Sequence, residues 1–176
     1  ETKRSDGQQP EYLMVKENTY HEEFLELFEP LKERLWRYCL TLNYDRDTAR
    51  EVLSQTVFES IENFHKLKNK QAFLSYLFTI ASRVNSRFIR QRRRESIPMD
   101  EGYFDSLACS SDAIEKLQIR ELHEALGKLP PEQKEAIVLF DLMGMSRAEA
   151  ATIQNVSEFA LKKRLERARA KLRELL

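Results

Sequence analysis

Apolar residues recur every three or four positions along most of the chain, which is the spacing of one face of an α-helix. The stretches that show it are 20–42, 53–64, 73–88, 114–126, 137–142 and 161–175. Pro30 interrupts the first stretch, and because proline removes a helical hydrogen bond, we expect two short helices or a kink there. With only 4 glycines and 5 prolines in 176 residues, the pattern predicts an all-α protein.

Two parts of the chain lack this periodicity. Residues 1–18 are polar and are predicted to be a tail. Residues 96–112 place Pro98, Gly102 and paired serines among acidic side chains, which is typical of a linker. We therefore predict two small helical domains, residues 19–95 and residues 113–176, joined by an acidic linker.

The end of the chain carries the local signals of a helix-turn-helix. Ser146 followed by Glu149 fits a capping box at the start of a short helix. Asn155 tolerates the left-handed backbone of a tight turn, and Ser157 can cap the next helix. The C-terminal domain is thus predicted to end in a helix-turn-helix.

The second of these helices is basic, with an apolar face at Leu161, Leu165 and Ala168. At 100° per residue, Phe159 and Lys163 lie on the opposite pole, in the turns that meet base edges when such a helix enters a major groove. The candidate DNA-reading residues are Ser157, Phe159, Ala160, Lys162, Lys163, Arg164, Arg167 and Arg169. The alternatives are a merely solvated charged face and a Phe159 ring folded back over the turn.

The 29 basic residues balance the 29 acidic ones, so any affinity for nucleic acid must come from local clusters of charge. Residues 83–94 hold six arginines and no acid, whereas residues 96–115 hold five acids and no base. Arginines aligned with an aromatic ring on one side of a predicted helix, residues 71–94, suit a phosphate track that leads to a stacked base. The candidates for contact with an opened DNA strand are Lys68, Asn69, Tyr76, Arg83, Arg87 and Arg90. A solvated charged face is again the alternative.

A further face lies on the helix predicted around residues 46–64. Glu51, Gln55, Phe58 and Glu62 fall within about 60° of one another on that helix. An exposed Phe among acids and an amide indicates a protein-binding surface, unless Phe58 packs under a neighbouring helix. The buried face of the same helix is predicted to consist of Leu53, Val57, Ser60, Ile61 and Phe64.

The sequence holds no catalytic constellation. Three scattered histidines, no phosphate loop and two distant cysteines, Cys39 and Cys109, predict neither an enzyme nor a metal or cofactor site. No apolar run approaches the roughly 18 residues of a membrane span, and no signal peptide is apparent. Scarce cysteines suit a reducing compartment, so we expect a cytoplasmic protein without membrane insertion.

Several motifs together resemble the extracytoplasmic-function (ECF) sigma factors, a family of bacterial transcription-initiation subunits. In the C-terminal part they are Leu129-Pro130, the D-x-x-G-x-S turn from Asp141, Val156-Ser157, and K-x-R-L-x-R-A-R from Lys162. In the N-terminal part, residues 51–61 resemble the family's D-L-V-Q-E-T-F-L-R-A-W, and residues 73–94 resemble its melting helix F-R-A-W-L with an arginine run. Tyr76 stands where the family has Trp, and Arg83 and Arg87 stand where it commonly has Asn and Asp.

The resemblance implies a sigma factor that binds core RNA polymerase and promoter DNA, with an anti-sigma factor as a candidate regulator. Its N-terminal domain would dock on polymerase and hold a flipped base of the −10 element, and its C-terminal helix would read the −35 element. The acidic linker would thread toward the active-site channel. The alternative is a free-standing helix-turn-helix regulator, which would bind a two-fold operator as a dimer.

Overall fold

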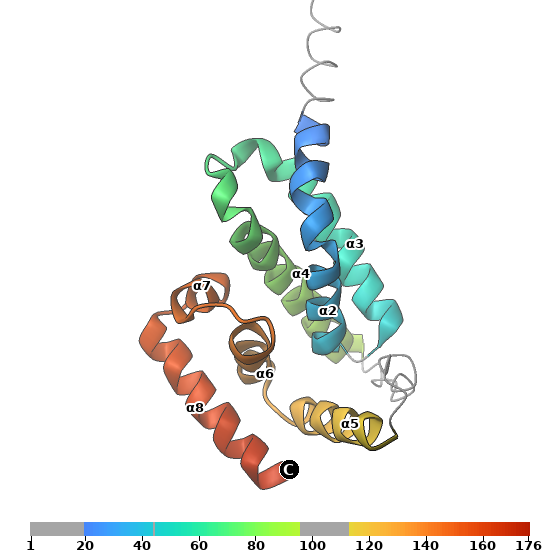
Figure 1. Ribbon diagram of the computed structural model, residues 1–176, viewed down its shortest axis with the longest axis vertical. Helices are drawn as coiled ribbons and strands as arrows, with labels where there is room; N and C mark the ends of the chain where they lie inside the picture. Colours follow the sequence, from blue (N-terminus) through green and yellow to red (C-terminus); the bar gives the residue numbers. More distant parts are fainter. Residues whose placement is uncertain (1–19, 44, 96–112) are drawn as a thin grey trace, which may run out of the picture.

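The computed structural model describes residues 20–43, 45–95 and 113–176, and the side chains of 20–43, 45–94 and 119–176 among them. Every regular element in these ranges is a helix, and none of the described residues forms a strand (Figure 1). The all-α prediction is therefore confirmed. The predicted tail and the predicted linker lie outside the described residues.

The N-terminal half is an antiparallel arrangement of helices joined by tight turns. A helix over residues 20–28 is followed by a 3₁₀ turn at Glu29–Leu31 and by α2, so that Pro30 separates two short helices as predicted. Asp45 caps α3 by accepting hydrogen bonds from the backbone N–H groups of Asp47 and Thr48. The bounds are α2 Lys32–Asn43, α3 Arg46–Asn63, 3₁₀ turns Phe64–Lys66 and Lys70–Ala72, and α4 Phe73–Glu95.

Aromatic rings fill the core of this half. Phe24 meets Phe64 and Phe73 edge to face, each with ring centroids 5.4 Å apart. Further along α4, the Phe78 ring lies 4.8 Å from that of Tyr38 on α2. All these side chains are buried, and edge-to-face pairs add to the stabilisation from burial. The core therefore fixes α4 against α2 and against the turn after α3.

The buried face of α3 differs from the predicted one. Ser60 and Phe64 are buried as expected, but Leu53, Val57 and Ile61 are only half-buried. The buried positions are instead Thr48, Ala49, Val52, Thr56, Ser60 and Phe64. Because α3 packs against both α2 and α4, its small side chains allow a close approach. The hydroxyls of Thr56 and Ser60 donate to carbonyls four residues earlier, at 2.6 Å each, so they are buried with their donors satisfied.

The C-terminal half ends in the predicted helix-turn-helix. Ser146 and Glu149 form a complete capping box at the start of α7, and the Ser157 side chain accepts from the Ala160 N–H at the start of α8. Gly144 and Asn155 adopt left-handed backbone conformations, with φ of 66° and 51°. The helices are α5 Ala113–Gly127, α6 Pro131–Ile137 with a π-helical turn Val138–Leu142, α7 Arg147–Ile153 and α8 Glu158–Leu175.

The two halves pack against each other, which the sequence did not predict. Their buried side chains form one continuous core, and α7 lies against α4 (Figure 1). Among the described residues, hydrogen bonds cross between α2 and the C-terminal half. Arg34 donates to the Met143 carbonyl, Tyr38 donates to Glu135 at 2.6 Å, and Lys134 donates to the Leu42 carbonyl at 2.6 Å. The described chain is thus one packed unit.

Candidate nucleic-acid and polymerase interfaces

The outer pole of α8 presents an exposed ring beside a cation. The Phe159 side chain is 70% exposed, so the alternative in which it folds over the turn is wrong. The Lys163 Nζ lies 5.7 Å from the centre of this ring. Leu161, Leu165 and Ala168 are buried on the opposite side of the helix, as predicted. An apolar ring and an ammonium group therefore face outward together from the first two turns of α8.

Two other basic residues of α8 are already bound within the C-terminal half. Arg164 is half-buried and donates to the Gln154 side chain at 2.8 Å. Arg169 forms two hydrogen bonds to Asp141, at 2.7 and 3.3 Å, and this contact raises the pKa of its guanidinium. These two arginines hold α8 in place, so the DNA contacts predicted for them would require them to exchange these partners.

Of the remaining candidates on α8, the two lysines already contact another side chain. Lys162 and Lys163 both reach Glu166, at 3.8 and 2.9 Å. Exposed pairs of this kind contribute little free energy and exchange readily with other anions. Arg167 is exposed, Ala160 is half-buried, and the Ser157 hydroxyl is used as the helix cap.

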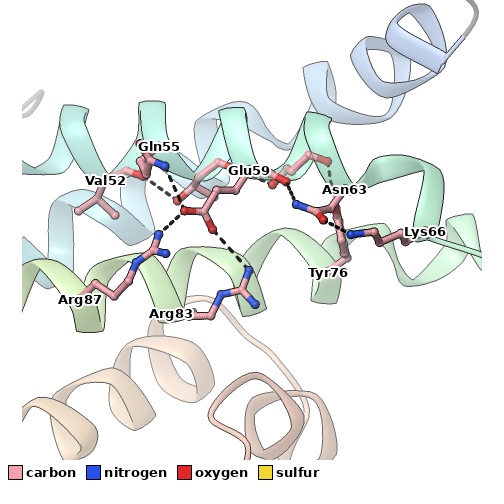
Figure 2. A network of polar contacts seen from close by, with 10 residues as sticks. Val52, Gln55, Glu59, Asn63, Lys66, Tyr76, Arg83 and Arg87 are labelled. Atoms are coloured by element: carbon pink, nitrogen blue, oxygen red, sulfur yellow. Dashed lines mark hydrogen bonds and ion pairs between the residues drawn. The ribbon is translucent and has the colours of Figure 1, made fainter. Parts of the chain in front are cut away.

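The arginines of α4 meet an acid that the sequence analysis missed (Figure 2). Arg83 lies 3.5 Å from Glu59 on α3, and Arg87 forms a hydrogen bond to the same carboxylate. Gln55 also donates to Glu59, at 3.1 Å. Helical periodicity relates residues within one helix and could not reveal a partner on another. Two guanidinium groups share one carboxylate, so a net positive charge remains on this surface.

The carboxyl group of Glu59 has a lowered pKa. Partial burial raises it, but the hydrogen bonds from Arg87 and Gln55 and the charges of Arg87 and Arg83 outweigh that effect. Its stabilising contribution is therefore complete above the ordinary pKa of about 4.3 and is lost as the pH falls through the lower folded-state value. The Glu59 side chain is 14% exposed, but both arginines are more than half exposed, so solvent screening keeps the contribution small.

We expect Glu59→Gln to lower the free energy of unfolding by about 1 kcal/mol at pH 7. That difference should shrink below about pH 4.3, where the wild-type carboxylate also becomes neutral. Urea unfolding followed by circular dichroism at pH 7 and at more acidic pH measures it. Glu62→Gln, at an exposed position on the same helix, is the matched control. A difference that stayed constant with pH would contradict the assignment.

Tyr76 lies in the wall of a cavity of about 420 Å³, together with Arg83. The ring is half-buried and stacked on Phe73 at 6.0 Å, and the hydroxyl donates to the Ser60 carbonyl at 2.7 Å. Burial raises the pKa of Tyr76 although the charge of Arg83 opposes this. These contacts therefore hold the Tyr76 ring in one orientation.

The structure does not bring all the predicted strand-binding residues to that cavity. Lys68 and Asn69 are exposed, and the Asn69 side chain caps a 3₁₀ turn by accepting from the Gln71 N–H at 3.0 Å. Arg90 is exposed and lines a second groove, of about 330 Å³, between α4 and α6. Of the predicted set, Tyr76 and Arg83 line the cavity described above.

The predicted polymerase-binding face is exposed on α3. Glu51, Gln55 and Glu62 are exposed, and the Phe58 ring is 57% exposed. The alternative in which Phe58 packs under a neighbouring helix is wrong for the described part of the chain. Because an exposed Phe ring gains from burial against a partner, this face is available for docking.

Within the described ranges, no group of three or more His, Cys, Asp or Glu side chains is placed to hold a metal ion. Among the described helices, none is both long enough and apolar enough to cross a membrane.

Comparisons with known proteins agree with this arrangement. Residues 27–95 match the family described as "Sigma-70 region 2", and residues 119–172 match "Sigma-70, region 4". The chain is 30% identical over 139 residues to the ECF RNA polymerase sigma factor EcfG of Rhodopseudomonas palustris, covering 79% of this chain and 77% of that protein. It is 26% identical to the ECF sigma factor SigM of Bacillus subtilis, covering 85% and 93% of the two chains.

Solved structures share the fold. The sigma factor RpoE from Bartonella quintana, in complex with the anti-sigma factor NepR, superposes with a TM-score of 0.74 at 24% identity, over 88% of this chain and 96% of that one. CnrH in complex with the cytosolic domain of CnrY gives a TM-score of 0.66 at 24% identity, over 88% of each chain. With both sigma-70 regions present, in order, and a relative at 30% identity across most of its length, this chain belongs to the ECF RNA polymerase sigma factors.

Proposed function

We propose that α8 reads the −35 promoter element, that the cavity beside Tyr76 receives an unstacked base of the −10 element, and that the Glu51–Glu62 face of α3 docks on core RNA polymerase. The observation that carries promoter reading is the outward pole of α8, where Phe159 and Lys163 point away from the core. The family supplies the general role, a promoter-specific initiation factor. The contacts and exposure of the residues in this chain indicate which surface performs each of these three tasks.

The pole of α8 suits base edges because its two side chains offer different chemistry. The C5-methyl group of thymine gives an exposed apolar ring a partner, and O6 and N7 of guanine accept hydrogen bonds from an ammonium group. Lys163 would have to leave Glu166, a surface contact of small free energy. Arg167, exposed at the side of the same helix, is placed for a phosphate.

The cavity beside Tyr76 suits a base because it combines a ring, a positive charge and room. Its volume of about 420 Å³ lies in the range of small-molecule sites. The Tyr76 ring can stack on a base, and Arg83 with Arg87 keeps excess positive charge where the backbone of the strand would pass. Lys68 and Asn69, exposed in the preceding turn, would contact the base edge.

The partners follow from this assignment. Core RNA polymerase and promoter DNA are required by the reaction, which takes place in the cytoplasm. RpoE and CnrH are each solved with a second protein, NepR for RpoE and the cytosolic domain of CnrY for CnrH, so an anti-sigma factor is a proposed partner here too. A free-standing dimeric regulator is not favoured, because it would need neither a sigma-70 region 2 nor an exposed docking face on α3.

Run-off transcription with core polymerase and a cognate promoter tests the assignment, with Tyr76 as the decisive position. Tyr76→Ala should slow promoter opening while leaving polymerase binding unchanged, because extraction of a base costs a few kcal/mol that stacking offsets. Tyr76→Trp, which restores the residue of the family pattern, should open promoters at a rate close to wild type. Opening kinetics can be followed with a fluorescent base in the −10 element. A normal rate for Tyr76→Ala would remove the role.

A further inference from the structure

One turn of α3 contacts three of the residues that we assign to the opened strand. The Ser60 carbonyl accepts a hydrogen bond from the Tyr76 hydroxyl at 2.7 Å. The neighbouring Glu59 carboxylate lies against Arg83 and Arg87 of α4 (Figure 2). Adjacent residues of α3 therefore position the ring and the two guanidinium groups of that site. Glu59 is the acid between them, and the function proposed above gives it no task.

The two carboxylate oxygens of Glu59 hold their arginines differently. Oε1 accepts from Arg87 and also from Gln55, the latter at 3.1 Å. Oε2 lies 3.5 Å from the Nη2 atom of Arg83, at the outer limit of a hydrogen bond. Arg83 also lines the cavity beside Tyr76. The close contact thus belongs to Arg87, and the loose contact belongs to the arginine at the cavity.

A carboxylate between two guanidinium groups stands where a backbone phosphate would bind. Arginine holds both anions through the same N–H donors, so Arg87 has fewer donors for a DNA strand while it is bonded to Glu59. Although partial burial raises the pKa of Glu59, the hydrogen bonds from Arg87 and Gln55 lower it below the ordinary value. The carboxylate is therefore ionised at neutral pH and competes with DNA for Arg87.

This competition affects specificity, because contacts with the DNA backbone strengthen binding to every sequence alike. Specificity is the ratio of the affinities for the correct sequence and for other sequences. Two guanidinium charges and one carboxylate charge leave a net charge of +1 here, where the two arginines alone would give +2. An ionised Glu59 lowers the sequence-independent part of the affinity, so stacking of a base on Tyr76 makes up a larger share of the remainder.

We propose that Glu59 is a specificity-determining residue, which keeps Arg87 from the DNA backbone and leaves Arg83 able to bind the strand at the cavity. Binding of the opened strand then depends on the unstacked base and not on charge alone. The inference rests on the strand-binding role proposed for Tyr76 and the arginines of α4. It requires that the wild-type chain makes one backbone contact fewer than these arginines could make.

Glu59→Gln tests this, because it removes the charge and keeps the shape of the side chain. The probe is fluorescent single-stranded DNA of random sequence, about twelve nucleotides long, bound by the free full-length chain at several salt concentrations. The affinity at low salt should rise about fivefold, since loss of an exposed ion pair changes a binding constant by up to about that factor. The slope of log K against log salt should steepen by about 0.7, which corresponds to one phosphate contact.

The matched control is Glu26→Gln, which removes an exposed carboxylate from the helix over residues 20–28 and should leave the slope unchanged. A double-variant cycle identifies the arginine. Arg87→Gln should cancel the gain that Glu59→Gln produces, whereas Arg83→Gln should leave most of it. Thermal unfolding followed by circular dichroism verifies that each variant is folded at the temperature of the assay.

The holoenzyme gives a second readout, the ratio of run-off transcripts from a cognate promoter and from one with a substituted −10 element. Glu59→Gln should lower this ratio, and it should do so only while Arg87 is present.

Two results would overturn the proposal. An affinity that falls or stays unchanged in Glu59→Gln would show that the carboxylate only positions the arginines, and a gain that survives Arg87→Gln would show a general effect of charge. The proposed function fails separately, through a normal opening rate for Tyr76→Ala, which does not depend on the charge at position 59.

Discussion

We expect core polymerase to lose nearly all of its affinity for the chain when Glu51→Lys, Gln55→Ala and Phe58→Ala are combined, while the fold survives. This result is expected because all three side chains are exposed and none belongs to the buried face of α3. Burial of a Phe ring against a partner contributes about 1.5 to 3 kcal/mol, and central aromatic residues often dominate an interface. With the charge reversal at position 51, the loss should reach several kcal/mol, or about a thousandfold in affinity.

The measurement is a titration of labelled chain with core polymerase, with thermal unfolding by circular dichroism as the test of the fold. Glu22→Lys with Leu25→Ala makes a matched control, because it changes an exposed acid and an exposed apolar residue on the helix over residues 20–28. Gln55 also donates to Glu59, so Phe58→Ala alone should show most of the loss without disturbing the arginine contacts. Undiminished affinity of the triple variant would mean that polymerase docks elsewhere.

The second large effect concerns base preference at the −35 element. Phe159→Ala and Lys163→Ala should each relax the preference at one or two positions, by about 1 to 3 kcal/mol per contact. Arg167→Ala should instead weaken all promoters alike, since a phosphate contact carries no sequence information. Because the Phe159 side chain is exposed, its truncation to alanine leaves no cavity in the protein. A change in base preference would therefore report a lost contact with DNA.

A base-substitution scan of that element, repeated with the three variant holoenzymes, separates the outcomes. Arg173→Ala, exposed near the far end of α8, is the control and should behave as wild type. Uniform losses for Phe159→Ala across every substituted base would show that its ring supports the docking of α8 and reads no base.

Local chemistry explains why much of the fold was predictable. Pro30 separates two helices, Asn155 takes a left-handed conformation, and Ser146 with Glu149 closes a capping box. Each of these features depends on residues within a few positions of each other along the chain. The exposure of Phe58 and Phe159 followed from helical periodicity for the same reason.

The buried face of α3 was the exception among the helices. Leu53, Val57 and Ile61 are apolar but only half-buried, whereas Val52, Thr56 and Ser60 are fully buried between the helices. The hydrophobic pattern ranks side chains by the free energy that they gain on burial, and not by their size. A helix packed closely against two others also selects for small size.

The sequence by itself determined the helices, their caps, the helix-turn-helix and the exposed poles, because periodicity and capping act over a few residues. Only the tertiary structure decided which charges are already paired and which helices share the wall of a cavity. Glu59 meets arginines 24 and 28 positions away, and Tyr38 meets Glu135 at a separation of 97. Ion pairs and cavity walls form between helices that packing brings together. No local sequence pattern predicts that Thr152 and Tyr76 line the same cavity.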